Sequence, residues 1–355
     1  MIVYLGVMAC LGMLFTVRSS NLAQTERAKD MLYWFAWLIL FLVVALRYNV
    51  GTDYKLYRSN FNNKYAATFS QIGKTDAALG ADLITVISKL IWNDYATWFF
   101  IMAVFAVFPC ALLIRRESIA PCLSTVLFVV LGCWHNSFNI VMQCASVGIL
   151  ALGYRFLRDR QFFKWCLICL LASMFHITTL VMIPVYFLVS SHISWRRILL
   201  LVGMGLLITV TYDELFSLMG TLSGNSMTES VDSSFGSNQL NIFRVLVNCA
   251  PAAMATVLLN YYDLKDKKFC MLYNLSLFNA VLNVGTMNSA YLNRFALYTI
   301  FYNALFIPYL VKPFKKNTRI FIWTVMLALY FVFWLYDLYK VPATKSFSWI
   351  FERGI

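Results

Sequence analysis

Apolar runs follow one another along almost the whole chain, with short polar segments between them. Most are close to the roughly 20 residues that an α-helix needs to cross a bilayer. The pattern predicts an all-α, polytopic transmembrane bundle of about 11 or 12 spans, forming a single integral membrane domain over residues 1–355. The predicted spans are residues 1–17, 31–46, 95–114, 120–137, 139–155, 161–175, 177–191, 198–212, 242–260, 269–287, 295–311 and 320–336. We interpret the first run as a retained helix, because no basic residue precedes it.

Two polar segments are long enough to form large loops, residues 47–94 and 213–241. Within the first loop, apolar residues at helical spacing predict a helix over 79–91. This helix lies either on the membrane surface or against the bundle, and the pattern leaves both arrangements open.

Composition and charge exclude a soluble protein and orient the bundle. Only 13% of the residues are charged, against roughly 25% in soluble domains. Most of the 29 basic residues fall in six short segments, which the positive-inside rule places in the cytoplasm. They are residues 18–30, 115–117, 155–164, 192–197, 261–268 and 312–319. Both termini and both large loops are then extracytoplasmic.

The same assignment explains the net charge of +13 without nucleic acid, since the basic loops meet anionic membrane lipid. It also decides how many spans residues 161–194 form, because this stretch is too long for one span and short for two. Because both flanking loops are cytoplasmic, this stretch must go out and return as two short helices meeting near His176.

The nine cysteines indicate neither a disulfide framework nor a metal site. All lie inside or at the ends of apolar runs, where cysteine behaves as a small hydrophobe. Cys166 and Cys169 form a CxxC that lacks nearby His or acidic partners. The chain has no P-loop, dinucleotide fingerprint or HExxH motif, so we do not expect nucleotide-driven chemistry in the cytosol.

The most distinctive polar segment is RYNVGTDYKLYRSNF, which begins at Arg47 at the outer end of the second span. It gathers Arg47, Asp53, Tyr54 and Tyr57 around Gly51, a residue that permits a sharp turn. The alternative is that Arg47 only extends to the lipid headgroups. The density of polar and aromatic groups favours a functional site.

Three further segments contribute candidates at the same predicted membrane face. His176 lies at the apex of the short hairpin, and its side chain suits a general base or, alternatively, caps two helices. Arg294 begins a span, and with Arg47 and Arg244 it offers guanidinium groups that bind phosphate oxygens in pairs. Asn139 and Gln143 line a sugar cleft or, alternatively, cap helix ends.

These residues carry a resemblance to the EpsG-like branch of the Wzy-type polysaccharide polymerases. The segments are RYNVGTDYKLY, FNIVMQ (138–143), FHITTLVMIP (175–184) and NRFALY (293–298), spread over roughly residues 1–312. One position departs from the pattern: Met142 stands where the family often has Arg. Arg244 is a candidate replacement for that missing cation.

The resemblance implies a bacterial inner-membrane enzyme that polymerises undecaprenyl-diphosphate-linked oligosaccharide units on the extracytoplasmic face, without nucleotide or metal. Arg47 and Arg294 would then hold the diphosphate, and His176 or Asp53 would deprotonate the acceptor hydroxyl. Tyr57, Asn139 and Gln143 would contact sugar, and we place Tyr54 and Arg244 with the substrate-binding residues. Expected partners include a flippase and a chain-length regulator.

Three other functions compete with this one. A transporter or flippase for a lipid-linked glycan typically has two related halves and polar groups at mid-membrane, which this sequence lacks. A sugar-modifying membrane acyltransferase also needs a histidine, but outward-facing arginines favour a diphosphate. A non-catalytic scaffold is the third alternative. The sequence does not distinguish O-antigen, capsule and exopolysaccharide as the product.

Overall fold

The computed structural model describes residues 1–20, 22–189, 192–211, 240–289, 292–340 and 346–354. The described residues are almost entirely helical, which confirms the all-α class. They divide into two compact units, unit 1 (Met1–Ile183 and Trp334–Ile355) and unit 2 (Pro184–Phe333). The predicted loop at 213–241 lies almost wholly outside the described residues. That the whole chain acts as one membrane domain stays a prediction.

Unit 1 begins with a helical hairpin and ends with a short segment from the C-terminus. Its elements are α1 (Ile2–Ser19), α2 (Glu26–Ala45), β1 (Arg47–Tyr48), α3 (Tyr54–Asn63), η1 (Phe69–Gln71), α4 (Leu79–Ile91), α5 (Tyr95–Glu117), α6 (Pro121–Val130), α7 (Cys133–Asn139), α8 (Val141–Arg158), α9 (Phe162–Ser173), η2 (Ile177–Val181), β2 (Ser348–Trp349) and η5 (Ile350–Glu352). Helix α10 (Met182–Leu188) starts in unit 1 and continues into unit 2.

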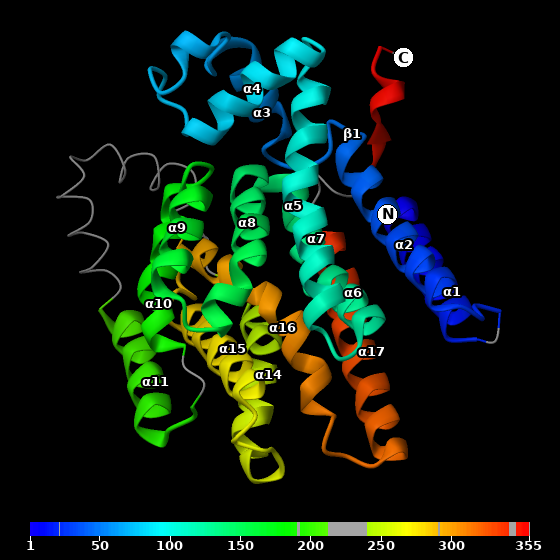
Figure 1. Ribbon diagram of the computed structural model, residues 1–355, viewed down its shortest axis with the longest axis vertical. Coiled ribbons are helices and arrows are strands. Elements are labelled where there is room, and N and C mark those ends of the chain that lie inside the picture. Colours follow the sequence, from blue (N-terminus) through cyan, green and yellow to red (C-terminus); the bar gives the residue numbers. More distant parts are fainter. Residues whose placement is uncertain (21, 190–191, 212–239, 290–291, 341–345, 355) are drawn as a thin grey trace. The chain divides into compact units, whose positions relative to one another are not determined.

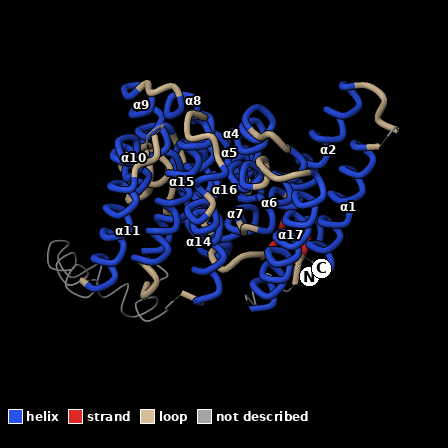
Figure 2. The backbone as a smooth tube through the Cα atoms, turned by 90° about the horizontal axis from the view of Figure 1, so that it is seen from below, coloured by secondary structure: helices blue, strands red, loops and turns tan. Residues whose placement is uncertain are grey.

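In unit 2, helix α15 occupies the centre. The elements are α11 (Trp195–Val210), α14 (Ile242–Val257), η3 (Leu259–Tyr261), α15 (Lys267–Gly285), η4 (Leu292–Ala296), α16 (Leu297–Leu310) and most of α17 (Lys316–Lys340). Helix α15 packs against α11, α14 and α16, and it lies among them in Figure 2. Fifteen of its 19 residues are buried, including three asparagines and one serine.

Each of the twelve predicted spans contains a helix, but the helices differ in length. Four of the described helices are long and apolar enough to cross a membrane: α1, α2, α5 and α17. Helices α6 and α7 meet the same criterion together, although the chain bends by 45° between them. Gly132, with a φ of +81°, lies at this bend. The shorter apolar helices include α9, the η2–α10 segment and α14.

Side-chain caps fix where several helices start. Thr25 accepts a hydrogen bond from the backbone N–H of Ala28 at the start of α2, and Asp94 accepts from Ala96 at the start of α5. Asp266 accepts from Lys268 and Phe269 at the start of α15. Such caps satisfy N–H groups that have no partner in the first helical turn.

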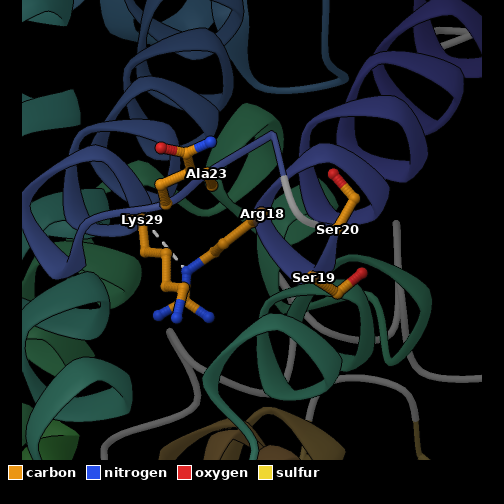
Figure 3. Close-up of a pocket in the computed structure, with 6 residues that line it drawn as sticks. Arg18, Ser19, Ser20, Ala23 and Lys29 are labelled. Carbon is orange, nitrogen blue, oxygen red and sulfur yellow. Dashed lines mark hydrogen bonds between the residues drawn. The ribbon is translucent and has the colours of Figure 1, made fainter.

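The basic loops of unit 1 gather at one end through ion pairs. Arg115 pairs with Asp30, and Arg158 pairs with Glu117, each at 2.6 Å. These two contacts join the three loops that the charge pattern assigns to one side of the membrane. A solvent-open cleft of about 590 Å³ lies at the α1–α2 turn there, lined by Arg18, Ser19, Ser20, Ala23, Gln24 and Lys29. Figure 3 shows the Nε of Arg18 donating to the carbonyl of Lys29 in this cleft.

Two basic loops of unit 2 also meet at one end. Lys312 lies 3.9 Å from the Asp266 carboxylate, and the Tyr262 hydroxyl donates to the carbonyl of Leu310. Asn274 donates to the carbonyl of His192, which brings the loop before α11 to the same end. Within each unit, therefore, the basic loops gather as the positive-inside pattern predicts.

The predicted out-and-back path near His176 is present as a short hairpin. The Nε1 of Trp165, early in α9, donates to the carbonyl of Met182 at the start of α10. Because these residues are neighbours, the chain must reverse between them. The predicted helix over 79–91 is also present as α4, and one of its faces is buried against the bundle. Whether its other face lies on the membrane surface stays a prediction.

Candidate functional site

The Gly51 turn packs directly against the end of α7. A Cβ built on Gly51 would lie 2.2 Å from the carbonyl oxygen of Phe138, and the φ of Gly51 is +106°. Beside it, the amide oxygen of Asn139 accepts from the Thr52 backbone N–H at 2.8 Å. Two of the sequence segments singled out above, 90 residues apart, thus form one structure. Figure 1 shows α3 and α4 at this end of unit 1.

Arg47 is buried beneath this turn, with 1% of its side chain surface exposed. Its guanidinium donates to the carbonyls of Val44 and Val50 on its own side of the turn. Its Nη2 lies 3.4 Å from the carbonyls of Ser137 and Phe138 at the end of α7. The guanidinium carbon also stands 4.7 Å from the ring centre of Phe99.

These contacts indicate that Arg47 holds two backbone segments together. Burial lowers the pKa of Arg47 to about 10, which leaves the group charged at neutral pH. Several carbonyl dipoles and an aromatic face replace the water that a buried cation loses. Its predicted contact with a diphosphate stays untested, and its surroundings favour a structural role.

The two tyrosines of α3 differ in exposure. Tyr54 is buried and stacks on Phe99 with ring centres 4.4 Å apart. Tyr57 is half-buried and packs against Trp98. Burial, and to a lesser degree the nearby Asp53 carboxylate, raise the pKa of Tyr57, so its hydroxyl stays protonated. Tyr57 therefore remains the better candidate for a sugar contact.

Asp53 is half-exposed at the start of α3, where it occupies the N-cap position without capping the helix by its side chain. Thr52 donates to its carboxylate at 3.2 Å. A carboxylate at the mouth of a rigid turn can accept a proton from a hydroxyl that reaches it. The neighbouring Gln143 and Met142, by contrast, are buried in the first turn of α8.

His176 follows the turn that α4 covers. The backbone N–H of Gly80 donates to the carbonyl of Met174 at 2.7 Å, and the ring of Phe175 lies where a Cβ of Gly80 would be. The Nδ1 of His176 hydrogen-bonds the Thr178 hydroxyl at 2.7 Å. This bond orients the half-buried imidazole at the hairpin apex.

Arg244 and Arg294 lie at one end of unit 2. Arg244 is in the first turn of α14, and Arg294 is in η4. The N–H of Leu240 donates to the carbonyl of Met287, which joins the start of α14 to the end of α15. Both arginines thus lie at the end of unit 2 that is opposite the Asp266–Lys312 contact.

Three features were not predicted from the sequence. A C-terminal strand, β2, pairs antiparallel with β1, placing Trp349 opposite Arg47. Asp82, fully buried in α4, accepts from the N–H groups of Ala66 and Gly73 and so organises the loop before it. The third is a cluster of buried asparagines around α15. Only this cluster has a sequence signal, since Asn279 and Asn283 lie four residues apart on one helical face.

The fold and the gathered polar residues define a polytopic membrane protein with a compact, structured loop region at one end of unit 1. The family model of the EpsG family matches residues 30–350. The chain therefore belongs to the EpsG family, and this membership supports a role like that of a polysaccharide polymerase. Searches of curated proteins and of solved structures found no match.

Proposed function

We propose that the protein polymerises lipid-linked oligosaccharide units at the extracytoplasmic face of the bacterial cytoplasmic membrane. In this reaction the growing glycan passes from undecaprenyl diphosphate to a hydroxyl of a new lipid-linked unit. The bond between the anomeric carbon and the diphosphate oxygen breaks, and a glycosidic bond forms. The diphosphate leaves as an anion, and the proton of the acceptor hydroxyl passes to a base.

The observation that carries the proposal is the location of Arg244 and Arg294 at the same end of unit 2, in a chain of the EpsG family. A lipid diphosphate lies at headgroup level, and its two phosphates take two cations. Arg244 then supplies the charge that Met142 lacks. We assign the diphosphate to these two residues and assign Arg47 to the support of the Gly51 turn.

The candidates for the base that accepts the proton are Asp53 and His176. Asp53 and His176 are half-buried, and each has a neighbouring hydroxyl that orients it, Thr52 and Thr178 respectively. Either can accept the proton of the sugar hydroxyl. Tyr57 is the candidate for a sugar contact, whereas the amide oxygen of Asn139 is already bonded to Thr52.

The test is reconstitution of the full chain in phospholipid nanodiscs with a lipid-diphosphate-linked repeat unit as the sole substrate. We expect a ladder of longer glycans without nucleotide sugar or divalent metal, and release of the lipid diphosphate with each addition. Arg294→Ala should abolish the ladder, whereas Arg196→Ala, at an exposed position in the basic first turn of α11, should retain it. Transfer of intact units between leaflets without any elongation would instead identify a flippase.

A further inference from the structure

The interior of unit 2 contains a connected hydrogen-bond network of buried amide side chains. Asn248 of α14 donates to Asn283 of α15 at 2.9 Å. Asn283 donates to both oxygens of Asn279, one turn earlier, at 2.8 and 3.2 Å. Asn293 of η4 donates to Asn283 at 3.3 Å and to the Thr286 hydroxyl at 3.1 Å. These asparagines are at most 9% exposed.

The network extends to both ends of η4. Asn279 donates to the carbonyl of Ala296 at 2.8 Å and to the Thr299 hydroxyl at 3.0 Å. At the other end, the N–H of Asn293 donates to the carbonyl of Ser289. Asn283 and Asn279 thus anchor η4 on either side of Arg294.

The same network reaches Arg244 through helix α14. Asn248 follows Arg244 by four residues, which places the two on one face of that helix. Asn283 is the common partner, because its amide oxygen accepts from Asn248 on one side and from Asn293 on the other. The arginines therefore stand on two elements that a single side chain joins.

Apolar packing alone would not fix this arrangement. Amide groups in a membrane interior are costly unless they are paired, and their directional bonds permit few alternative registers between helices. The two phosphates of a diphosphate are joined by one oxygen and therefore require cations at a fixed separation. A network that fixes the register between α14 and η4 meets this requirement.

We propose that the asparagine network of unit 2 sets the spacing between Arg244 and Arg294, and so makes this end of the unit selective for a diphosphate over a monophosphate. Asn248, Asn283 and Asn293 are positioning residues: they act on the ligand through the arginines. This inference rests on the proposed function for its ligand, a polyprenyl diphosphate. It adds the residues that determine selectivity.

The experiment measures binding of geranylgeranyl diphosphate and geranylgeranyl monophosphate to the full-length protein in nanodiscs. Asn248→Ala and Asn293→Ala each disconnect one arginine from Asn283. Each should weaken diphosphate binding by about tenfold and monophosphate binding much less, because one arginine still suffices for one phosphate. The matched control is Asn274→Ala, a buried asparagine of α15, the helix of Asn283, whose side chain donates to the carbonyl of His192.

We expect the control to leave both affinities at the wild-type value, even where it lowers the melting temperature. If Asn248→Ala and Asn293→Ala lower the melting temperature as the control does but keep the wild-type selectivity, the network is only structural and the inference fails. The two proposals can also fail separately. If the wild-type protein binds diphosphate selectively and the variants lose this selectivity, but the wild-type protein forms no glycan ladder, the proposed function is refuted and the positioning role of the asparagines stands. Asn283→Ser, a smaller change at the centre, provides a second test if the alanine variants do not fold.

Discussion

At the scale of single residues, the Gly51 turn has no room for a side chain. A methyl group at Gly51 would meet the carbonyl oxygen of Phe138 at 2.2 Å, in a backbone conformation that L-residues disfavour. We expect Gly51→Ala to lower the free energy of unfolding by about 2 kcal/mol or more. Thermal unfolding in detergent measures this.

Gly12 provides the control for that substitution. It lies in α1 with nothing within 4 Å of its ideal Cβ, so Gly12→Ala should be neutral or slightly stabilising. Equal melting temperatures for the two variants would show that the turn does not pack as described.

Arg47 gives a second prediction at this scale. Its planar guanidinium donates to carbonyls of two segments, which an ammonium group cannot reproduce. Arg47→Lys should therefore destabilise the protein by about 1.5–3 kcal/mol and leave diphosphate binding by the folded fraction unchanged. Wild-type stability combined with lost diphosphate binding would restore the direct binding role suggested by the sequence.

The sequence could identify Arg47 as notable but not assign its role. An arginine that follows an apolar span can extend to headgroups, bind a ligand or be buried. Which of these occurs depends on the carbonyls of Ser137 and Phe138, and their proximity is a result of folding. The contact between the Gly51 turn and Asn139 could likewise not be predicted from the sequence, although both segments were identified as candidates.

At the scale of elements, hydropathy predicted where the helices lie because each apolar run must satisfy its backbone within a helix. The bounds of α4 match the predicted 79–91, and the hairpin around His176 follows from charge alone. The strand β2 was missed because it has only two residues in an aromatic segment. The asparagine network was missed because Asn248 and Asn293 meet Asn283 only through helix packing.

The C-terminal segment offers a prediction about an element. Strand β2 pairs with β1, and the ring of Phe347 contacts that of Tyr4 near the start of α1. Deleting residues 347–355 should speed amide hydrogen exchange in β1 and lower the melting temperature. Arg353→Ala should cost no more than about 1 kcal/mol, since its ion pair with Asp94 is partly exposed. Unchanged exchange in β1 after the deletion would contradict this role.

At the scale of the whole molecule, the charge pattern predicts a membrane orientation, and the ion pairs of unit 1 agree with it. Asp30–Arg115 and Glu117–Arg158 join loops rich in Lys and Arg at one end of unit 1, and the Gly51 turn is at the other. We predict that Asn62→Cys, in exposed α3, reacts with an impermeant maleimide in intact cells. Gln161→Cys should react only after permeabilisation. If both cysteine variants were labelled in intact cells, the predicted orientation would be wrong.

Polymerisation of lipid-linked units is the central claim, and the surface glycan of the living cell tests it most directly. Deletion of the gene should remove long chains from a glycan gel and retain the single-unit form. The wild-type gene and Arg196→Ala should restore the ladder, whereas Arg294→Ala, present in the membrane at equal amount, should not. A full-length ladder in the deletion strain, or the loss of every surface form, would contradict the account.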